Sequence, residues 1–267
     1  MANTFAGAAR RHGRRAVTGR ALLLSALLVA SGRGFAASPE DLVRAYPEAL
    51  SKFDGTNLVW RDGTLMPFGQ VHVGQDEALA RASVADQLAA HYPADAPSPP
   101  TDDPGRARNE AFFDKMYGDC RVGEVSHRLV RVVWLPRNSG RAVSVTSVNG
   151  VNRALEAVSD ELDNLPAEYQ KFLYPIGGTY NCRRVAGTEQ RSMHSWGAAI
   201  DLNPAYADYW RWKRSWGGAD TYANRIPQRI VAVFERHGFI WGGRWSHYDT
   251  MHFEYRPELL PLHGTPD

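Results

Sequence analysis

Long apolar runs are missing from this chain, and so is a large excess of charge of either sign. The main apolar run, residues 21–30, is about ten residues long, whereas a helix needs roughly 20 to span a bilayer. The sequence has 31 Lys+Arg against 29 Asp+Glu, so no strongly basic surface of the kind that binds nucleic acid is expected. No internal repeat is evident.

The short apolar run has the surroundings of a secretory signal peptide. Residues 1–36 carry six arginines and no acids, and small residues follow the run at 34–37. We predict a signal peptide over residues 1–37 and export to the periplasm or the cell wall, with an uncleaved membrane anchor as the alternative. The adjacent Arg14 and Arg15 permit the twin-arginine route as well as the general one. Without residues 1–36 the charged residues number 25 against 29, a net charge of −4.

Cysteine is scarce as well. The two cysteines, Cys120 and Cys182, lack the C-x-x-C spacing of a metal or redox site. In an oxidising compartment a disulfide between them is expected, and two free thiols are the alternative. The closed loop of roughly 60 residues would stabilise the fold by about 4 kcal/mol.

The remaining length of about 230 residues suffices for one large domain with a substantial core. An aromatic content of 11% with eight tryptophans argues against disorder. The patterns predict helices near the following positions: 39–43, 78–90, 109–117, 151–162 (closed by Pro166) and 226–234. Strands are predicted near 58–64, 129–135, 142–146, 199–202 and 239–241.

Residues that can carry chemistry gather at two places. His194 and Asp201 are separated by small residues, which let the backbone pass close to a metal ion. Asp249 lies three residues before His252, near the end of the chain. Each pair alone fits an ordinary core pair. Together they offer two imidazoles, one carboxylate and a further acid, which is the minimum set of a zinc hydrolase that keeps an open position for water.

The two stretches together resemble a known family, the metallopeptidases that cut D-Ala-D-Ala and related peptidoglycan peptides. The similar pattern is Ser192-x-His194-x-x-Gly197-x-Ala199-x-Asp201, followed by Asp249-x-x-His252. The family includes the vancomycin-resistance D,D-peptidases and the phage L-alanyl-D-glutamate endolysins. The resemblance is strong from about residue 180 to 257 and looser back to residue 106. It implies an α+β fold of the Hedgehog/DD-peptidase type, a small antiparallel β-sheet with flanking helices.

By this resemblance His194, Asp201 and His252 are the ligands of one Zn²⁺ ion, and Asp249 is the general base. The vancomycin-type members have Glu three residues before the last histidine. Because the Asp249 side chain is shorter, its backbone must lie closer to the attacking water, as in the endolysins. The family also uses an arginine to stabilise the developing oxyanion. Arg183 is the candidate for that role, and Arg184 is its rival.

Three further residues near the motifs are candidates for supporting roles. Ser192 is expected to brace the site or to touch substrate rather than to act as a nucleophile. Glu254 faces the same side of a strand as His252 and can hold its ring by a hydrogen bond. His247 is expected around the ligands or at the surface, with a fourth-ligand role as the alternative.

These residues predict an exported zinc peptidase that acts on peptidoglycan stem peptides, most simply as a D-alanyl-D-alanine carboxypeptidase. The chain then divides into the signal peptide, an N-terminal extension with a Pro-rich connector at 38–105, and a metallopeptidase domain at 106–267. An endopeptidase on the same polymer and a non-catalytic metal-binding or wall-binding module are the alternatives. The intact Asp249 argues against the second.

Overall fold

The computed structural model describes residues 1–4, 37–93, 101–214 and 222–260. The predicted signal peptide lies almost entirely outside the described residues. Residues 34–267 cluster as one compact unit, and all that follows concerns its described part. Within the described ranges, no helix combines the length and the apolar character that crossing a membrane requires.

Helices and strands alternate irregularly along the chain. The helices are α1 (Pro39–Ala45), α2 (Gln75–Ala80), α3 (Val84–Ala89), α4 (Glu110–Tyr117), α5 (Val151–Asp163), α6 (Ala167–Leu173), α7 (Trp210–Arg214) and α8 (Gln228–Arg236). The strands are β1 (Leu50–Phe53), β2 (Asn57–Trp60), β3 (Leu65–Pro67), β4 (Leu129–Trp134), β5 (Arg141–Thr146), β6 (Ala199–Asp201), β7 (Phe239–Trp241) and β8 (His252–Tyr255).

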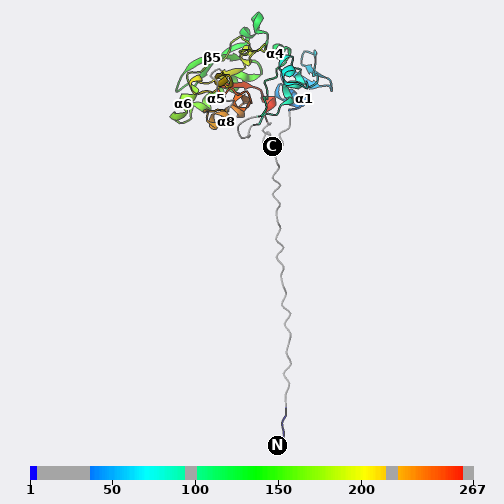
Figure 1. Cartoon of the computed structure of the whole chain (residues 1–267), viewed down its shortest axis with the longest axis vertical. Helices are drawn as coiled ribbons and strands as arrows, with labels where there is room; N and C mark the ends of the chain where they lie inside the picture. Colours follow the sequence, from blue (N-terminus) through cyan, green and yellow to red (C-terminus); the bar gives the residue numbers. More distant parts are fainter. Residues whose placement is uncertain (5–36, 94–100, 215–221, 261–267) are drawn as a thin grey trace. The chain divides into compact units, whose positions relative to one another are not determined.

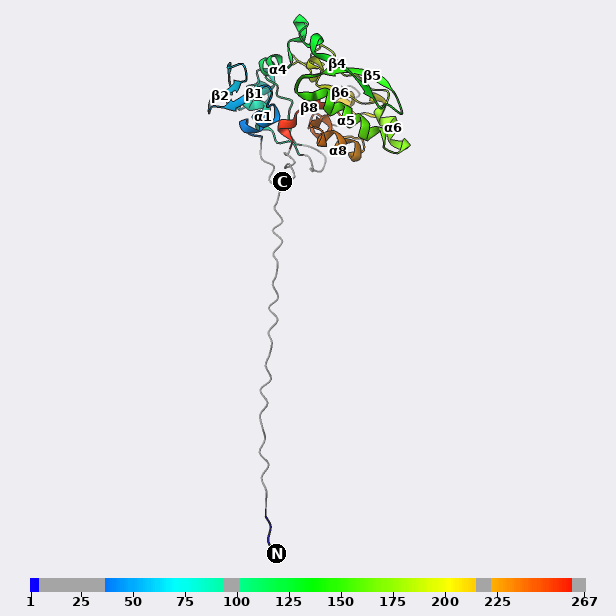
Figure 2. The same ribbon diagram turned by 180° about the vertical axis from the view of Figure 1, so that it is seen from behind.

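The strands form three small antiparallel sheets, with the orders β1-β2-β3, β4-β5 and β6-β8-β7. Figures 1 and 2 show α5 and α8 close to the second and third sheets, with α1 on the other side of β8. Small antiparallel sheets flanked by helices confirm the predicted α+β class.

The core lies between these helices and the third sheet. Helix α5 turns a stripe of fully buried residues, including Leu155 and Val158, toward β4, β5 and α8. From α8, the ring of Phe234 stacks on Phe253 of β8 with the centroids 3.9 Å apart. Each large apolar side chain buried in this way contributes about 1.5–3 kcal/mol. The strand β8, which carries His252, therefore rests on a well-packed helical layer.

The N-terminal extension shares this core instead of standing apart from it. The hydroxyl of Tyr46 donates to Glu258 Oε2 at 2.7 Å, a buried contact. The hydroxyl of Tyr92 donates to Glu235 Oε1 at 2.7 Å and accepts the backbone N–H of Trp241 at 2.9 Å. Hydrogen bonds thereby join the extension to α8, to β7 and to the turn that follows β8.

One predicted helix is wrong. The single helix expected at 78–90 is two short helices, α2 and α3, because Ser83 begins a new helix with a capping box to Asp86. Helix α5 ends at Asp163, within one residue of the predicted end, and Pro166 follows as the N-cap of α6. The other predicted helices and strands are confirmed to within a few residues.

Candidate metal centre

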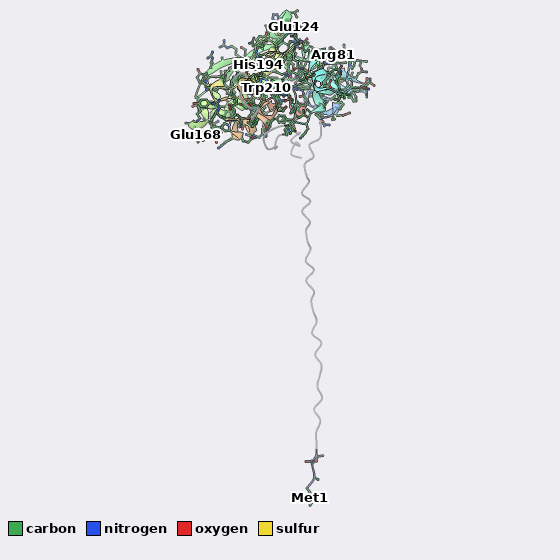
Figure 3. The ribbon with its side chains drawn as sticks, viewed as in Figure 1. Met1, Arg81, Glu124, Glu168, His194 and Trp210 are labelled. Carbon is green, nitrogen blue, oxygen red and sulfur yellow. A yellow bond between two sulfur atoms is a disulfide. The ribbon has the colours of Figure 1, made fainter. Side chains whose placement is uncertain are left out.

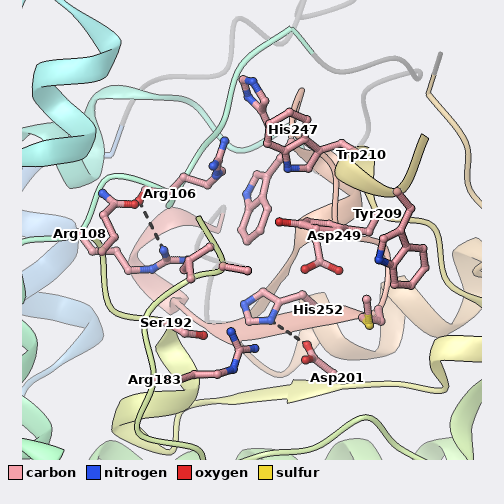
Figure 4. A pocket seen from close by; sticks show the side chains of 16 residues that line it. Arg106, Arg108, Arg183, Ser192, Asp201, Tyr209, Trp210, His247, Asp249 and His252 are labelled. Atoms are coloured by element: carbon pink, nitrogen blue, oxygen red, sulfur yellow. Dashed lines mark hydrogen bonds and ion pairs between the residues drawn. The ribbon is translucent and has the colours of Figure 1, made fainter. Parts of the chain in front are cut away.

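The register of the third sheet brings two of the predicted ligands together. Strands β6 and β8 are antiparallel, and Asp201 is the direct partner of His252. Directly opposed residues have Cβ atoms about 5 Å apart, so their side chains meet on one face of the sheet. His252 Nδ1 lies 2.9 Å from Asp201 Oδ1, an interaction drawn in Figure 4.

The third candidate ligand, His194, lies in a 3₁₀ turn, η4 (Met193–Trp196), just before β6. The turn ends at Gly197, whose φ of +67° favours glycine, and a Cβ there would lie 2.8 Å from Leu129 Cδ2. This glycine lets the chain reverse so that His194 faces Asp201. His194 is buried well inside the folded part, whereas Glu124 and Glu168 lie at its edge (Figure 3).

One ligand atom from each of His194, Asp201 and His252 lies within 4.8 Å of the other two. The ring of His194 approaches the carbonyl oxygen of Thr179 through Nδ1, which as a donor leaves a lone pair on Nε2. That Nε2 atom lies 3.1 Å from Asp201 Oδ2, yet it is buried with no hydrogen-bond partner among the described residues. In the second imidazole, that of His252, Nε2 faces Glu254 and Nδ1 faces Asp201.

This donor set fits a zinc ion. Two imidazole nitrogens and a carboxylate oxygen converge, and each ring has its second nitrogen engaged by an oxygen acceptor, as is usual for metal-binding histidines. The unpartnered Nε2 of His194 is a buried polar atom that a cation would satisfy.

Glu254 supports His252 from behind. Its Oε2 lies 3.0 Å from His252 Nε2 and accepts Arg108 Nη2 at 2.5 Å, while Oε1 accepts Arg256 Nη1 at 3.3 Å. Burial raises the pKa of Glu254, but the charge of Arg108 and the His252 hydrogen bond outweigh it and lower the pKa to about 2. Burial lowers the pKa of His252, and the hydrogen bonds to Asp201 and Glu254 raise it to about 10 in the metal-free protein.

Asp249 reaches the same cleft from the turn that precedes β8 (Figure 4). Its backbone N–H donates to Gly242 at 3.0 Å, and a Cβ on Gly242 would lie only 2.5 Å from the Asp249 carbonyl oxygen. The backbone of Asp249 therefore packs against Gly242 more closely than a side chain at that position would allow. Burial, together with the charge of Asp201, raises the pKa of Asp249 to about 7, and its Oδ1 is buried without a partner among the described residues.

The structure separates the two candidate arginines. Arg183 lines the cleft and makes no ion pair within the described ranges, whereas Arg184 is paired with Glu189 and does not line this cleft. Ser195 holds Arg183 in place, because its hydroxyl accepts the Arg183 N–H at 3.0 Å and donates to the Arg183 carbonyl at 2.8 Å.

Ser192 and His247 also line the cleft. Ser192 caps the turn η4 by accepting the N–H of His194 at 3.4 Å, so it braces the turn that carries His194. His247 is not in the three-residue cluster, and its Nδ1 lies 2.6 Å from Asp103 Oδ2. The fourth-ligand alternative for His247 finds no support here.

The disulfide between Cys120 and Cys182 is present, as predicted. It joins the residue next to Arg183 to a short 3₁₀ turn, η1 (Cys120–Val122). The loop that carries Arg183 is thus fixed at two neighbouring points, by the disulfide and by Ser195.

Several residues of the site have no signal in the sequence. Thr179 acts through its backbone carbonyl, which any residue could supply. Arg106 and Arg108, which we call the connector arginines because they directly follow the connector, also line the cleft. Three aromatic residues line it from the region of α7: Tyr209, Trp210 and Trp212.

Comparison with protein families identifies the family to which the two motifs are similar. Residues 186–255 match the family model described as D-alanyl-D-alanine carboxypeptidase. The predicted resemblance is confirmed over these residues. No curated protein matches the chain. The match covers η4, β6, α7, α8, β7 and β8, and thus includes the three candidate ligands, His194, Asp201 and His252, together with Asp249. The match to this carboxypeptidase family supports the prediction of a peptidase.

Proposed function

We propose that this protein is an exported zinc-dependent peptidase that hydrolyses peptidoglycan stem peptides as a D-alanyl-D-alanine carboxypeptidase. The observation that carries the proposal is the convergence of His194, Asp201 and His252 within 4.8 Å, with Asp249 in the same cleft. The proposal includes cleavage of the signal peptide and the division of the mature chain into an extension to residue 105 and a peptidase domain from 106. It also includes the Hedgehog/DD-peptidase type of fold.

In the proposed mechanism His194, Asp201 and His252 hold one Zn²⁺ ion, which would polarise the scissile carbonyl and acidify water. Asp249 takes the proton of the attacking water at the carboxylate and returns it to the leaving amine. Its raised pKa suits both halves of that task near neutral pH.

Arg183 and Glu254 complete the proposed roles. Arg183, unpaired and beside the ligands in Figure 4, stabilises the oxyanion that develops on the attacked carbonyl. Glu254 contacts Nε2 of His252 and keeps the ring oriented with Nδ1 toward Asp201, as a ligand of the metal would need. Ser192 borders the substrate.

The test combines metal analysis with product identification. The mature protein is expected to contain one zinc per chain and to release free D-alanine from muropeptides ending in D-Ala-D-Ala, and a chelator is expected to abolish this activity. Cleavage within the stem or the cross-link, without free D-alanine, would instead identify an endopeptidase. Hydrolysis that is insensitive to chelators would refute the metal site.

A further inference from the structure

The cleft beside the metal centre has two chemically different walls. Its volume is about 240 Å³. The connector arginines Arg106 and Arg108 line it together with Arg183, from the loop after Cys182, and with aromatic residues from the region of α7. In the view of Figure 4, Arg106 and Arg183 lie on opposite sides of the His252 ring. Arg183 already has a place in the proposed mechanism, so the cationic groups on the connector side require a separate explanation.

The connector arginines cover their own carboxylate partners. Arg106 donates to Asp103 at 2.8 Å, and the arginine side chain is 12% exposed against 3% for the acid. Arg108 donates to Glu254 at 2.5 Å, with exposures of 5% and 0%. In each pair the carboxylate lies beneath its arginine, so the surface that this wall presents to the cleft is cationic.

Arg106 is the member of the two that can still bind an anion. A guanidinium has five N–H donors, and Asp103 is the single acceptor of the Arg106 guanidinium among the described residues. Arg108, by contrast, is nearly buried against Glu254 and serves the support of His252.

Asp103 fixes the orientation of Arg106 before any ligand arrives. Besides Arg106, it accepts the backbone N–H of His247 at 2.9 Å and the hydroxyl of Ser246 at 3.0 Å, and it contacts His247 Nδ1 at 2.6 Å. A guanidinium held by a buried carboxylate loses little freedom on binding a second anion, which favours affinity. Arg106 and Arg108 also lie outside residues 186–255, so the match to the family model assigns them no role.

We propose that Arg106 forms an anion subsite that binds a carboxylate of the substrate peptide next to the metal centre. Bidentate pairing of arginine with a carboxylate supplies both charge and direction. The inference rests on the proposed function for its substrate. A stem peptide has two kinds of carboxylate to offer: the C-terminal group, and the α-carboxylate of an internal D-glutamate residue.

The experiment crosses enzyme variants with substrate variants. Zinc-loaded wild type and Arg106→Gln are given a D-Ala-D-Ala-terminated stem peptide, its C-terminal amide, and the peptide amidated at the internal α-carboxylate. For wild type, we expect kcat/KM to fall about 10- to 100-fold for the amide that removes the bound carboxylate. In Arg106→Gln that same amidation is expected to have almost no further effect, and the amide that matters identifies the carboxylate.

Two further variants control for damage to the fold. Arg106→Lys keeps the charge and is expected to retain part of the discrimination between acid and amide. Arg81→Gln removes an exposed arginine that also pairs with an acid, Glu77 at 3.0 Å, but lies outside this cleft, and its discrimination should equal that of wild type. If Arg106→Gln slows all three peptides by the same factor, or if wild type does not distinguish them, the subsite is refuted.

A binding measurement separates this inference from the proposed function. Should wild type hydrolyse none of the peptides, the proposed function fails, and titration calorimetry of the same acids and amides judges the subsite alone. Binding that needs one carboxylate in wild type and loses that dependence in Arg106→Gln supports the subsite. Equal binding of acid and amide, or no binding to wild type, overturns it.

Discussion

Replacing Glu254 by glutamine should weaken both the fold and the metal site. The carboxylate is fully buried and contacts three side chains, namely Arg108, Arg256 and His252. Arg256 keeps Glu258 as a second partner at 2.6 Å, whereas Arg108 has no other carboxylate in the described part of the chain. The substitution therefore leaves one guanidinium buried without a compensating charge.

Two independent estimates give the size of the effect on stability. Loss of one partner of a buried ion pair typically costs about 3–5 kcal/mol. The pKa of Glu254, lowered from 4.5 to about 2, corresponds to about 3 kcal/mol at 1.36 kcal/mol per pKa unit. Because the folded pKa is the lower one, this stabilisation is present above about pH 4.5 and is lost as the pH falls toward 2.

The assay is denaturant unfolding at pH 7 together with zinc affinity. We expect the free energy of unfolding to fall by about 3 kcal/mol in Glu254→Gln, and the zinc affinity to fall about 10- to 100-fold because His252 loses its support. Glu156→Gln, an exposed glutamate on α5, serves as the matched control and should change neither quantity. A loss of stability below 1 kcal/mol with unchanged zinc affinity would refute this view of Glu254.

Three other changes test the site and its surroundings. Asp249→Asn should lower kcat by about 100- to 10,000-fold while zinc content stays at the wild-type level, because only the proton-transfer group is removed; a kcat within a few-fold of wild type contradicts the base assignment. Since the pKa of His252 is about 10 without metal, zinc binding at pH 8 should release about one proton, and its affinity should rise as the pH is raised toward 10. Calorimetry in buffers of different ionisation enthalpy measures that proton, and heats that do not vary with the buffer speak against it. Replacing both Cys120 and Cys182 by serine should lower the free energy of unfolding by about 4 kcal/mol in urea titrations, and an unchanged midpoint would show that the disulfide does not constrain the unfolded chain.

Short-range patterns made part of this molecule predictable. The stripe of α5 and the alternation in β4 and β5 are local properties, and the structure has both elements where the sequence indicates them. The candidate ligands were identified because their motif is specific in residue type and spacing. The break between α2 and α3 was missed because a capping residue, Ser83, interrupts a segment whose composition is otherwise helical.

Long-range packing explains what could not be predicted. Nothing near Arg106 in the sequence indicates that the connector returns to the cleft, since that placement depends on contacts such as Trp245 Nε1 with the Pro104 carbonyl at 2.6 Å. Ser195 is likewise an ordinary serine until the fold sets it between the N–H and the carbonyl of Arg183. Such roles arise from tertiary structure, which a single sequence records only indirectly.

Because Asp201 pairs directly with His252 across β6 and β8, metal binding depends on the register of these two strands. If β8 shifted by one residue against β6, every side chain of the shifted strand would turn to the opposite face, and the two donors would no longer meet. A chain trapped in that misaligned state offers no three-donor cluster. Zinc would thus bind and stabilise only molecules with the native register of β6 and β8. The ion needed for catalysis would also favour correctly folded molecules over misfolded ones.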